Sequence, residues 1–343
     1  MSAPVPAADD LKVDVTTIEK QLADLWRAEK PDDGSEAVTK AALWNVVAHT
    51  WNAGQHAHAT EVLARASASV PQRTIVVQAD PRGTAGISSW ISANCHLIGG
   101  GKQVCSEEVT IVASGDRVHH VAPLVNALLL PDMPVAVWWV GDLPDEHHEY
   151  AETLLDPADR LIVDSAHFSD VADLHLVSRI AEQTTTAPAD LNWARLDEWR
   201  AATAAIFDPP PMRERLGAIR NVRVTSGGDT SFGAASEALL YVAWLSAQSG
   251  VDVAFEFLTE GDAQGIGAVE IHFTDATVST IRHERERNVV VATSGGTETS
   301  IDCVTRTGGK ETEDLIVRLL KRPEADRVYL ATLKAARRLA TAK

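Results

Sequence analysis

The chain has 343 residues, a length typical of two domains, and its 45% hydrophobic and 23% charged residues are typical of a folded protein. Acidic side chains number 48 against 31 basic ones, and the resulting net charge of −17 disfavours binding to nucleic acid phosphates. No apolar run approaches the roughly 18 residues of a membrane helix, the start lacks a signal peptide pattern, and three cysteines are too few for a secreted disulfide framework. We therefore expect a cytoplasmic protein that binds neither nucleic acid nor membrane.

Residues 1–35 are predicted to form a tail and a docking helix, because apolar residues recur at helical spacing from Val15 to Trp26 before Pro31. The apolar run at 41–50, the helical pattern at 54–70 and the β-branched run at 73–79 then read as a βαβ unit. Such a unit implies a parallel sheet.

Two strand-like runs, 86–98 and 102–114, follow with only three glycines between them. Antiparallel strands can be joined that tightly, whereas parallel strands cannot, so the sheet is predicted to be mixed. Beyond them the pattern alternates between helix and strand, with helices at 118–130, 145–155 and 170–182 and strands at 134–140 and 160–165. We predict that 36–185 is a three-layer α/β domain whose mixed sheet is mostly parallel.

The segment 186–210 is predicted to hold a linker rich in Thr, Ala and Pro and a helix that bridges into the next domain. Residues 211–343 read as an α+β domain with an antiparallel meander. Its expected strands are 219–225, 251–258, 267–273, 277–282, 287–293 and 298–304, and its expected helices are 230–248, 311–321 and 324–341.

Two glycine-rich segments are candidate phosphate loops. The "GGGK" segment at 99–102 lacks Walker spacing and precedes a strand, whereas "TSGGDTSFG" at 225–233 lies between a strand and a helix but does not fit G-x-G-x-x-G. For the second segment an ordinary capped helix start is preferred over an anion site. We therefore expect no nucleotide cofactor.

Histidine is abundant at twelve, with local pairs at 56/58, 119/120 and 147/148. None has the spacing of a zinc motif, and the adjacent pair at 119/120 faces two sides of its helix. Ser165, Asp164 and His167 lie too close in sequence to imply a catalytic triad. We expect neither a metal site nor a catalytic group.

Nine tryptophans are the most unusual feature of the composition. Trp138 and Trp139 are adjacent in a strand, so they point to opposite sheet faces, and one of them could line a crevice. The predicted helix at 191–207 carries tryptophan and arginine, the residue types that dominate protein interfaces, although packing between domains explains them equally well. These helix residues are Trp193, Arg195, Trp199 and Arg200.

Several segments, in this order and at this spacing, resemble the glucose-6-phosphate dehydrogenase assembly protein family, known as OpcA. They are "CSEEVTIVASG" (105–115), "MPVAVWWVGDLP" (133–144), "DRLIVDSAHF" (159–168), "ADLNWARLDEWRAATAAIFD" (189–208) and "EALLYVAWLSAQSG" (237–250). The resemblance runs from about residue 40 to 320, and its most specific piece is the "DLNWARL..WR" stretch.

The resemblance implies a protein without catalytic activity of its own, which binds glucose-6-phosphate dehydrogenase and promotes its active oligomer or its affinity for glucose 6-phosphate. An activator of this kind works by binding the active assembly more tightly than the inactive one. Candidate interface residues are the four on the 191–207 helix together with Trp138, Trp139, Asp164 and His167. The alternative is a sugar-phosphate-binding protein or enzyme that uses the crevice at the ends of strands 134–140 and 160–165.

Cys95 and Cys105 lie on the two strands around the glycines. If Gly100 is the midpoint of a hairpin turn, the two cysteines fall directly opposite each other and a disulfide can form, whereas a slip of one residue would forbid it. Two reduced core cysteines and a conditional redox pair both remain open.

Overall fold

The computed structural model describes residues 15–28, 39–98, 102–143, 148–228, 232–294, 301–306 and 311–341. Its contacts divide the chain into two compact units that interleave along the sequence. The first unit comprises 1–163, 185–187 and 312–324, and the second comprises 164–184, 188–311 and 325–343. The sequence prediction instead placed one linker, 186–210, between two continuous domains.

A mixed, mostly parallel sheet forms the centre of the first unit. Its strands are β1 (Thr39–Lys40), β2 (Trp44–Thr50), β3 (Gln72–Asp80), β4 (Gly86–Ile98), β5 (Lys102–Ser114), β6 (Val135–Trp139), β7 (Arg160–Val163) and β8 (Ala187–Asp190). Only Ala187 of β8 belongs to the first unit, because the second unit begins again at Pro188. They are arranged in the order β1-β5-β3-β2-β6-β7-β8, and β4 pairs antiparallel with β5. This confirms the predicted α/β class with a mixed sheet. The segment predicted as a linker begins instead with β8, whose Ala187 N–H donates to Asp159 O at 2.9 Å.

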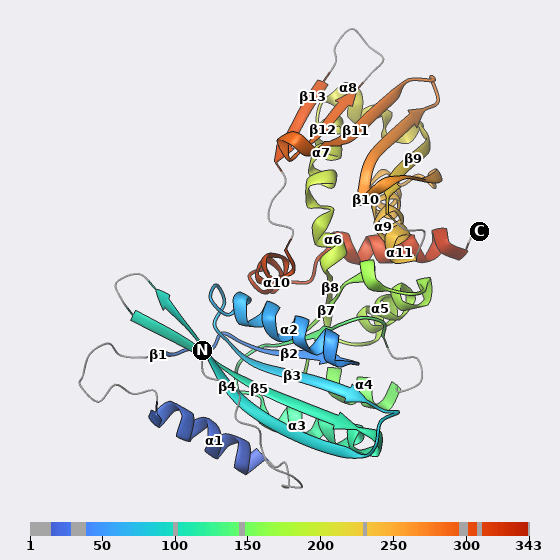
Figure 1. Ribbon diagram of the computed structural model, residues 1–343. Helices are drawn as coiled ribbons and strands as arrows, with labels where there is room; N and C mark the ends of the chain where they lie inside the picture. Colours follow the sequence, from blue (N-terminus) through green and yellow to red (C-terminus); the bar gives the residue numbers. More distant parts are fainter. Residues whose placement is uncertain are drawn as a thin grey trace. The chain divides into compact units, whose positions relative to one another are not determined.

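Helices cover both faces of this sheet, which makes the first unit three-layered (Figure 1). One face carries α2 (Ala53–Ala66) and α10 (Thr312–Leu320), and the other carries α1 (Val15–Ala28), α3 (Val121–Leu128) and α4 (His148–Leu155). Every residue of β2 and of β6 is buried. Continuous apolar strands of this kind are expected where both faces of a parallel sheet are covered.

The α1 helix is attached to the sheet by a buried arginine. Arg73, which is 3% exposed, donates to Glu107 Oε2 at 2.6 Å and to Glu19 Oε1 on α1 at 2.7 Å. Trp26 on the same helix donates its indole N–H to Glu107. Ile18 and Leu22 on the apolar side of α1 are each 1% exposed. Hydrogen bonds and apolar packing therefore both attach the helix to the sheet.

A second, mostly antiparallel sheet forms the centre of the second unit. Its strands are β9 (Ile219–Gly227), β10 (Ala254–Phe273), β11 (Val278–Glu284), β12 (Val289–Ser294) and β13 (Ile301–Arg306), in the order β13-β12-β11-β10-β9. Residues 254–259 and 264–273 of β10 both register with β9. The sequence predicted two separate strands here, whereas the structure has one long element, which turns where Gly261 and Gly265 adopt positive φ.

The helices of the second unit are α5 (Val171–Gln183), α6 (Leu191–Arg195), α7 (Asp197–Phe207), α8 (Pro210–Arg213), α9 (Phe232–Ser249) and α11 (Arg327–Thr341). The single helix predicted at 191–207 is therefore two helices. The break occurs at Leu196, whose N–H donates to Trp193 O three residues back, while Arg200 N–H begins the next helix by bonding to Leu196 O. None of the helices in the described ranges is long and apolar enough to cross a membrane.

Candidate functional site

The four candidate interface tryptophans lie in the interior. Trp138 and Trp139 are 2% and 0% exposed in the first unit, and Trp193 and Trp199 are 3% and 1% exposed in the second. Trp193 donates its indole N–H to Asp326 Oδ2 at 2.9 Å, and its ring lies beneath the Arg200 guanidinium at 3.4 Å from the ring centroid. Trp193 and Trp199 thus pack within the second unit, whereas the sequence left open packing between two domains.

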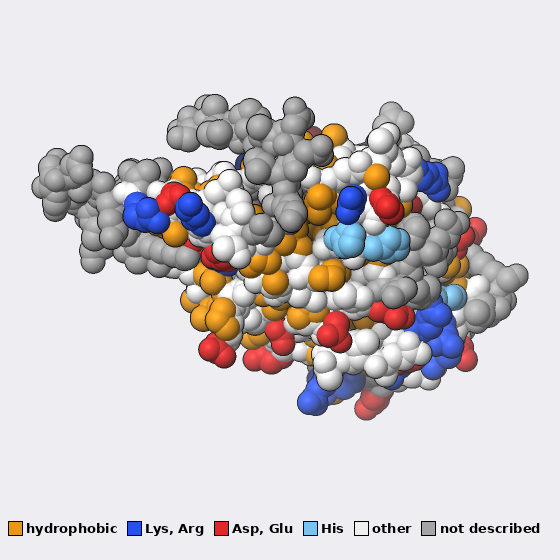
Figure 2. Space-filling view, turned by 90° about the horizontal axis from the view of Figure 1, so that it is seen from below, with side chains coloured by type: hydrophobic (Ala, Val, Ile, Leu, Met, Phe, Trp, Pro, Cys, Tyr) orange, Lys and Arg blue, Asp and Glu red, His pale blue; other side chains and the backbone are white. Residues whose placement is uncertain are grey.

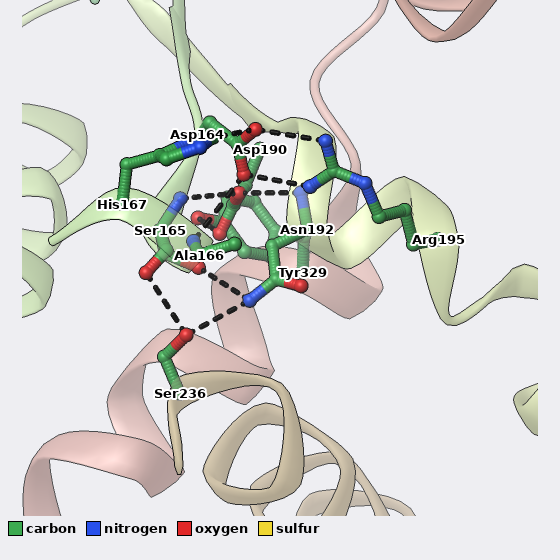
Figure 3. Close-up of polar contacts among 9 residues, drawn as sticks. All are labelled: Asp164, Ser165, Ala166, His167, Asp190, Asn192, Arg195, Ser236 and Tyr329. Atoms are coloured by element: carbon green, nitrogen blue, oxygen red, sulfur yellow. Dashed lines mark hydrogen bonds and ion pairs between the residues drawn. The ribbon is translucent and has the colours of Figure 1, made fainter. Parts of the chain in front are cut away.

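The structure brings three other candidates, Asp164, His167 and Arg195, into one cluster (Figure 3). Asp164 directly follows β7 and caps a short 3₁₀ turn (Ser165–His167) by accepting from Ala166 N. Arg195 ends α6 and grips Asp164 with two bonds, Nη1 to Oδ1 at 2.7 Å and Nη2 to Oδ2 at 2.8 Å. His167 Nδ1 lies 3.3 Å from Asp164 Oδ2. All three residues belong to the second unit.

Burial and charge give this cluster a defined ionisation. Burial disfavours the charged form of Asp164, but hydrogen bonds from His167 and Arg195 and the charge of Arg195 outweigh it, and the pKa of Asp164 falls to about 2. The hydrogen bond to Asp164 raises the pKa of His167. The His167 side chain is 69% exposed, whereas Asp164 is 7% exposed. The cluster can therefore hold a cationic imidazole at a fixed place on the surface.

A second carboxylate, Asp190, lies behind the cluster and was not among the sequence candidates. It is fully buried, and its Oδ1 accepts from the N–H groups of Ser165 (3.1 Å) and Asn192 (2.9 Å), while Oδ2 accepts from the Tyr329 hydroxyl at 3.2 Å. Burial and the nearby charge of Asp164 raise the pKa of Asp190 to about 6, against the opposing hydrogen bonds. The one sequence signal was an aspartate at the start of a helix, which is common and unspecific.

Asn192 extends these bonds into a buried network. Its side-chain amide donates to Ser165 Oγ at 3.1 Å and to Ser236 Oγ at 2.9 Å, and the Ser236 hydroxyl donates to Ser165 O at 2.9 Å. Ser236 comes from α9 and Tyr329 from α11, so residues far apart in sequence meet here (Figure 3). The network fixes the backbone that carries Asp164 and His167.

In the first unit the sheet has a topological switch point between β2 and β6, because the chain passes from β2 to β3 on one side and later enters β6 on the other. The carboxyl ends of strands at such a point are where open α/β sheets bind ligands. Here aromatic rings occupy it. His49 stacks on Trp139 with centroids 3.9 Å apart and meets Trp51 at 4.5 Å and Tyr150 at 5.6 Å.

His49 is fully buried, and neither ring nitrogen has a hydrogen-bond partner within the described ranges. Burial lowers the pKa of His49 to about 3. A histidine within an apolar strand was the one sequence signal of this cluster. Burial among the rings of Trp51, Trp139 and Tyr150 thus keeps this imidazole neutral.

Cys95 and Cys105 form a disulfide between β4 and β5. The strands register these two residues directly opposite each other, as expected from a turn centred on Gly100. The three glycines of the turn itself lie outside the described residues.

The other chemical candidates gain no support. Where the structure is described, no three His, Cys, Asp or Glu side chains come together as a metal site. His147 of the third histidine pair lies outside the described residues, as do Asp229 and Thr230 of the second glycine-rich segment. The part of that segment that is described ends β9 at Gly227, and α9 begins at Phe232.

Comparison with protein families gives a match to each half of the chain. Residues 63–179 match the model described as "Glucose-6-phosphate dehydrogenase subunit N-terminal domain", and residues 186–333 match the corresponding C-terminal domain. Together they cover more than half of the chain. The chain belongs to the OpcA family. The resemblance of the quoted segments is thereby confirmed.

Curated OxPP cycle proteins named OpcA are similar to this chain. The one from Synechocystis sp. is 30% identical over 185 residues, and the one from Synechococcus elongatus is 31% identical over 182 residues. These alignments cover 53% and 52% of this chain but 38% and 40% of the relatives, which are the longer proteins. The names of the matched families and relatives thus refer to a glucose-6-phosphate dehydrogenase subunit and to an OxPP cycle protein.

Solved structures with a similar arrangement are oxidoreductases. A variant of the 3-ketoreductase KijD10 from Actinomadura kijaniata aligns with a TM-score of 0.47 and 10% identity, covering 88% of this chain and 98% of its own. The biliverdin reductase of Synechocystis sp. aligns with a TM-score of 0.46 and 11% identity, covering 88% of this chain and 98% of its own. Likeness at this level says nothing about the activity of this chain.

Proposed function

We propose that this protein is a non-catalytic assembly factor in the cytoplasm that binds glucose-6-phosphate dehydrogenase and activates it allosterically, thereby supporting NADPH production. The observation that carries the proposal is the pair of family matches, which span 63–179 and 186–333 and are both described as dehydrogenase subunit domains. An activator of this kind must bind the active assembly of the enzyme more tightly than the inactive one.

The Asp164 cluster supports a specific contact surface. His167 presents an exposed imidazole whose position is fixed by Asp164, and Arg195 fixes Asp164 in turn with two short bonds. A preorganised charged group loses little side-chain entropy on binding. We therefore place the dehydrogenase contact at His167 and the surface around it, with Asp164 and Arg195 as its supports.

The proposal is tested by titrating the protein into glucose-6-phosphate dehydrogenase from the same cell at sub-saturating glucose 6-phosphate. Activity is expected to rise, and the two proteins are expected to co-elute. If activity does not rise and the two proteins do not co-elute at any ratio, the proposal is wrong. A melting shift with glucose 6-phosphate alone would instead favour the sugar-phosphate interpretation.

A matched pair of variants locates the contact. His167→Ala is expected to raise the concentration needed for half-maximal activation roughly tenfold, the effect of losing a modest interface hot spot. His119→Ala removes an exposed histidine from the first unit and is expected to change nothing. Equal effects of both variants would show that the contact lies elsewhere.

The disulfide adds a redox component to the proposal. If the Cys95–Cys105 bond influences activation, a reductant should change the concentration of wild-type protein needed for half-maximal activation. The same reductant should leave that concentration unchanged for a Cys95→Ser/Cys105→Ser double variant. A thiol count that finds both cysteines free after air oxidation would remove this component without affecting the binding proposal.

A further inference from the structure

The β4 strand forms an outer edge of the first sheet. It pairs with β5 over all 13 residues from Gly86 to Ile98 without a register shift, and in the described part of the chain no strand pairs with its other side. Figure 1 shows it as the outermost long strand at the bottom of the sheet. An edge strand presents a row of backbone N–H and C=O groups to which another strand can bond.

The register shows which backbone groups point outward. Cys105 uses its carbonyl to accept from Ala41 N, on the side of β5 away from β4, at 3.4 Å. Cys95 and Cys105 are therefore a non-hydrogen-bonded pair, consistent with their Cα separation of 4.0 Å. Hydrogen-bonded and non-hydrogen-bonded pairs alternate along an antiparallel ladder. The odd-numbered residues of β4 therefore direct their N–H and C=O groups away from β5. They include Ile87, Ser89, Ile91, Ala93 and Cys95.

This edge lacks the devices that usually protect one. Natural edge strands are kept from pairing by charged residues, prolines, bulges or short length. β4 has 13 residues, no Asp, Glu, Lys, Arg or Pro, and no bulge. The other edge of the same sheet is protected, because β8 has only four residues and one of them is Pro188. The contrast marks β4 as a strand suited to pairing.

α1 covers one face of this hairpin. Its Trp26 reaches Glu107 on β5, and its Glu19 reaches Arg73 on β3. The side chains from Trp90 to His96 on β4 are all partly exposed. The face that carries α1, α3 and β4, seen directly in Figure 2, gathers hydrophobic side chains in its middle and charged ones mainly at its margins.

We infer that two copies of this chain pair β4 against β4, antiparallel and about a two-fold axis, so that the sheet continues from one copy into the other. Antiparallel pairing of a strand with itself gives a closed, isologous dimer. Each copy carries a net charge of −17, so approach through most of the surface brings like charges together. The uncharged β4 sets neutral residues opposite each other in every register.

A proline at an outward position tests the inference. Ala93→Pro removes an N–H that points away from β5, a place where edge strands tolerate proline, so the hairpin should keep its own bonds. Ala93→Ser is the matched control that retains the N–H. Sedimentation velocity should give the wild type and Ala93→Ser twice the 36.9 kDa mass of one chain. Ala93→Pro should have the mass of one chain and the melting temperature of wild-type protein that has been diluted to single chains.

Hydrogen exchange supplies a readout that does not depend on the variant. In the wild-type dimer the amides of Ile91 and Ala93 should exchange slowly, and they should exchange fast when dilution separates the copies, while the even-numbered amides stay protected in both. A wild type that remains one chain at the highest reachable concentration would overturn the inference. Protection of the odd-numbered β4 amides only in the presence of the dehydrogenase would also overturn it, because the dehydrogenase would then be the partner of this edge. This inference is independent of the proposed function.

Discussion

The two units bury a titratable side chain in opposite ways. In the first unit His49 is enclosed by the rings of Trp51, Trp139 and Tyr150, and its nitrogens have no partner in the described ranges. In the second unit Asp190 is equally buried but receives two backbone N–H groups and a hydroxyl. Burial alone keeps the His49 imidazole neutral. For Asp190 the hydrogen bonds oppose the rise in pKa that burial causes.

His49 and Asp190 should therefore contribute to the pH dependence of stability with opposite signs. Between pH 6.5 and 3 the unfolded chain binds a proton at His49 that the folded chain does not, so stability falls as pH falls. For Asp190 the folded chain binds the proton more tightly, so between pH 6 and 3.8 stability rises as pH falls. His49→Phe and Asp190→Asn test this contrast, and Arg195→Leu and Arg200→Met test the contacts of the second unit.

The largest effect is expected from His49→Phe. A pKa lowered from 6.5 to about 3 corresponds to about 5 kcal/mol of stability lost between neutral pH and pH 3, and the variant should lose this pH dependence. Urea unfolding across this range, with hydrogen exchange of the β2 amides, reports the first unit. The exposed control His119→Phe should leave the slope of unfolding free energy against pH as in the wild type. The same slope in His49→Phe as in the wild type would contradict the burial of a neutral ring.

Arg195→Leu should destabilise the second unit by about 4 kcal/mol, because it leaves the buried carboxylate of Asp164 without its two guanidinium bonds. Urea unfolding at pH 7 measures the loss. The control is Arg220→Leu, since Arg220 is exposed on β9. A loss below 1 kcal/mol would mean that water replaces the guanidinium easily.

Asp190→Asn should abolish about 3 kcal/mol of pH dependence between pH 6 and 3.8, with the sign opposite to that of His49. The amide keeps an oxygen for the two backbone donors. Hydrogen exchange of α6 and α9 between pH 4 and 7 follows the second unit. Asp170→Asn changes a surface helix cap for an equally good one and should have no effect on the slope.

The smallest effect, about 1 kcal/mol, is expected from Arg200→Met, which removes the cation above Trp193 but keeps an apolar chain over the ring. Arg200→Lys retains a charge and should recover part of the loss. Both are measured by urea unfolding at pH 7. Equal stability of the Met variant and the wild type would show that apolar contact alone accounts for the packing.

The sequence predicted most elements of the fold because their signals are local. Alternation and turn chemistry located the β4–β5 hairpin, and the opposition of Cys95 and Cys105 followed from counting residues from its turn. The break at Leu196 was missed because the apolar pattern continues through it at helical spacing. The strand at 187–190 was missed because its Thr, Ala and Pro context is typical of a linker.

The site was predictable only in part. Asp164 and His167 were found because the end of a parallel strand is a common place for functional side chains, and Arg195 because of its residue type in a helix. Asp190 and Tyr329 are 139 residues apart, and nothing in one sequence shows that they meet. The tryptophans were placed at an interface by residue type alone, and burial is the competing effect that the sequence could not weigh.

The interleaving of the units has a consequence for synthesis on the ribosome. Arg160 at the start of β7 donates to the carbonyls of Arg322 (2.7 Å) and Glu324 (2.9 Å), and Arg65 on α2 pairs with Glu313 at 3.0 Å. Arg160 is buried in the folded protein. During synthesis its guanidinium therefore lacks these two acceptors until the last twentieth or so of the chain has been translated. Fragments cut near residue 185 should misfold or aggregate when expressed alone, and supplying residues 312–324 as a separate peptide should rescue them.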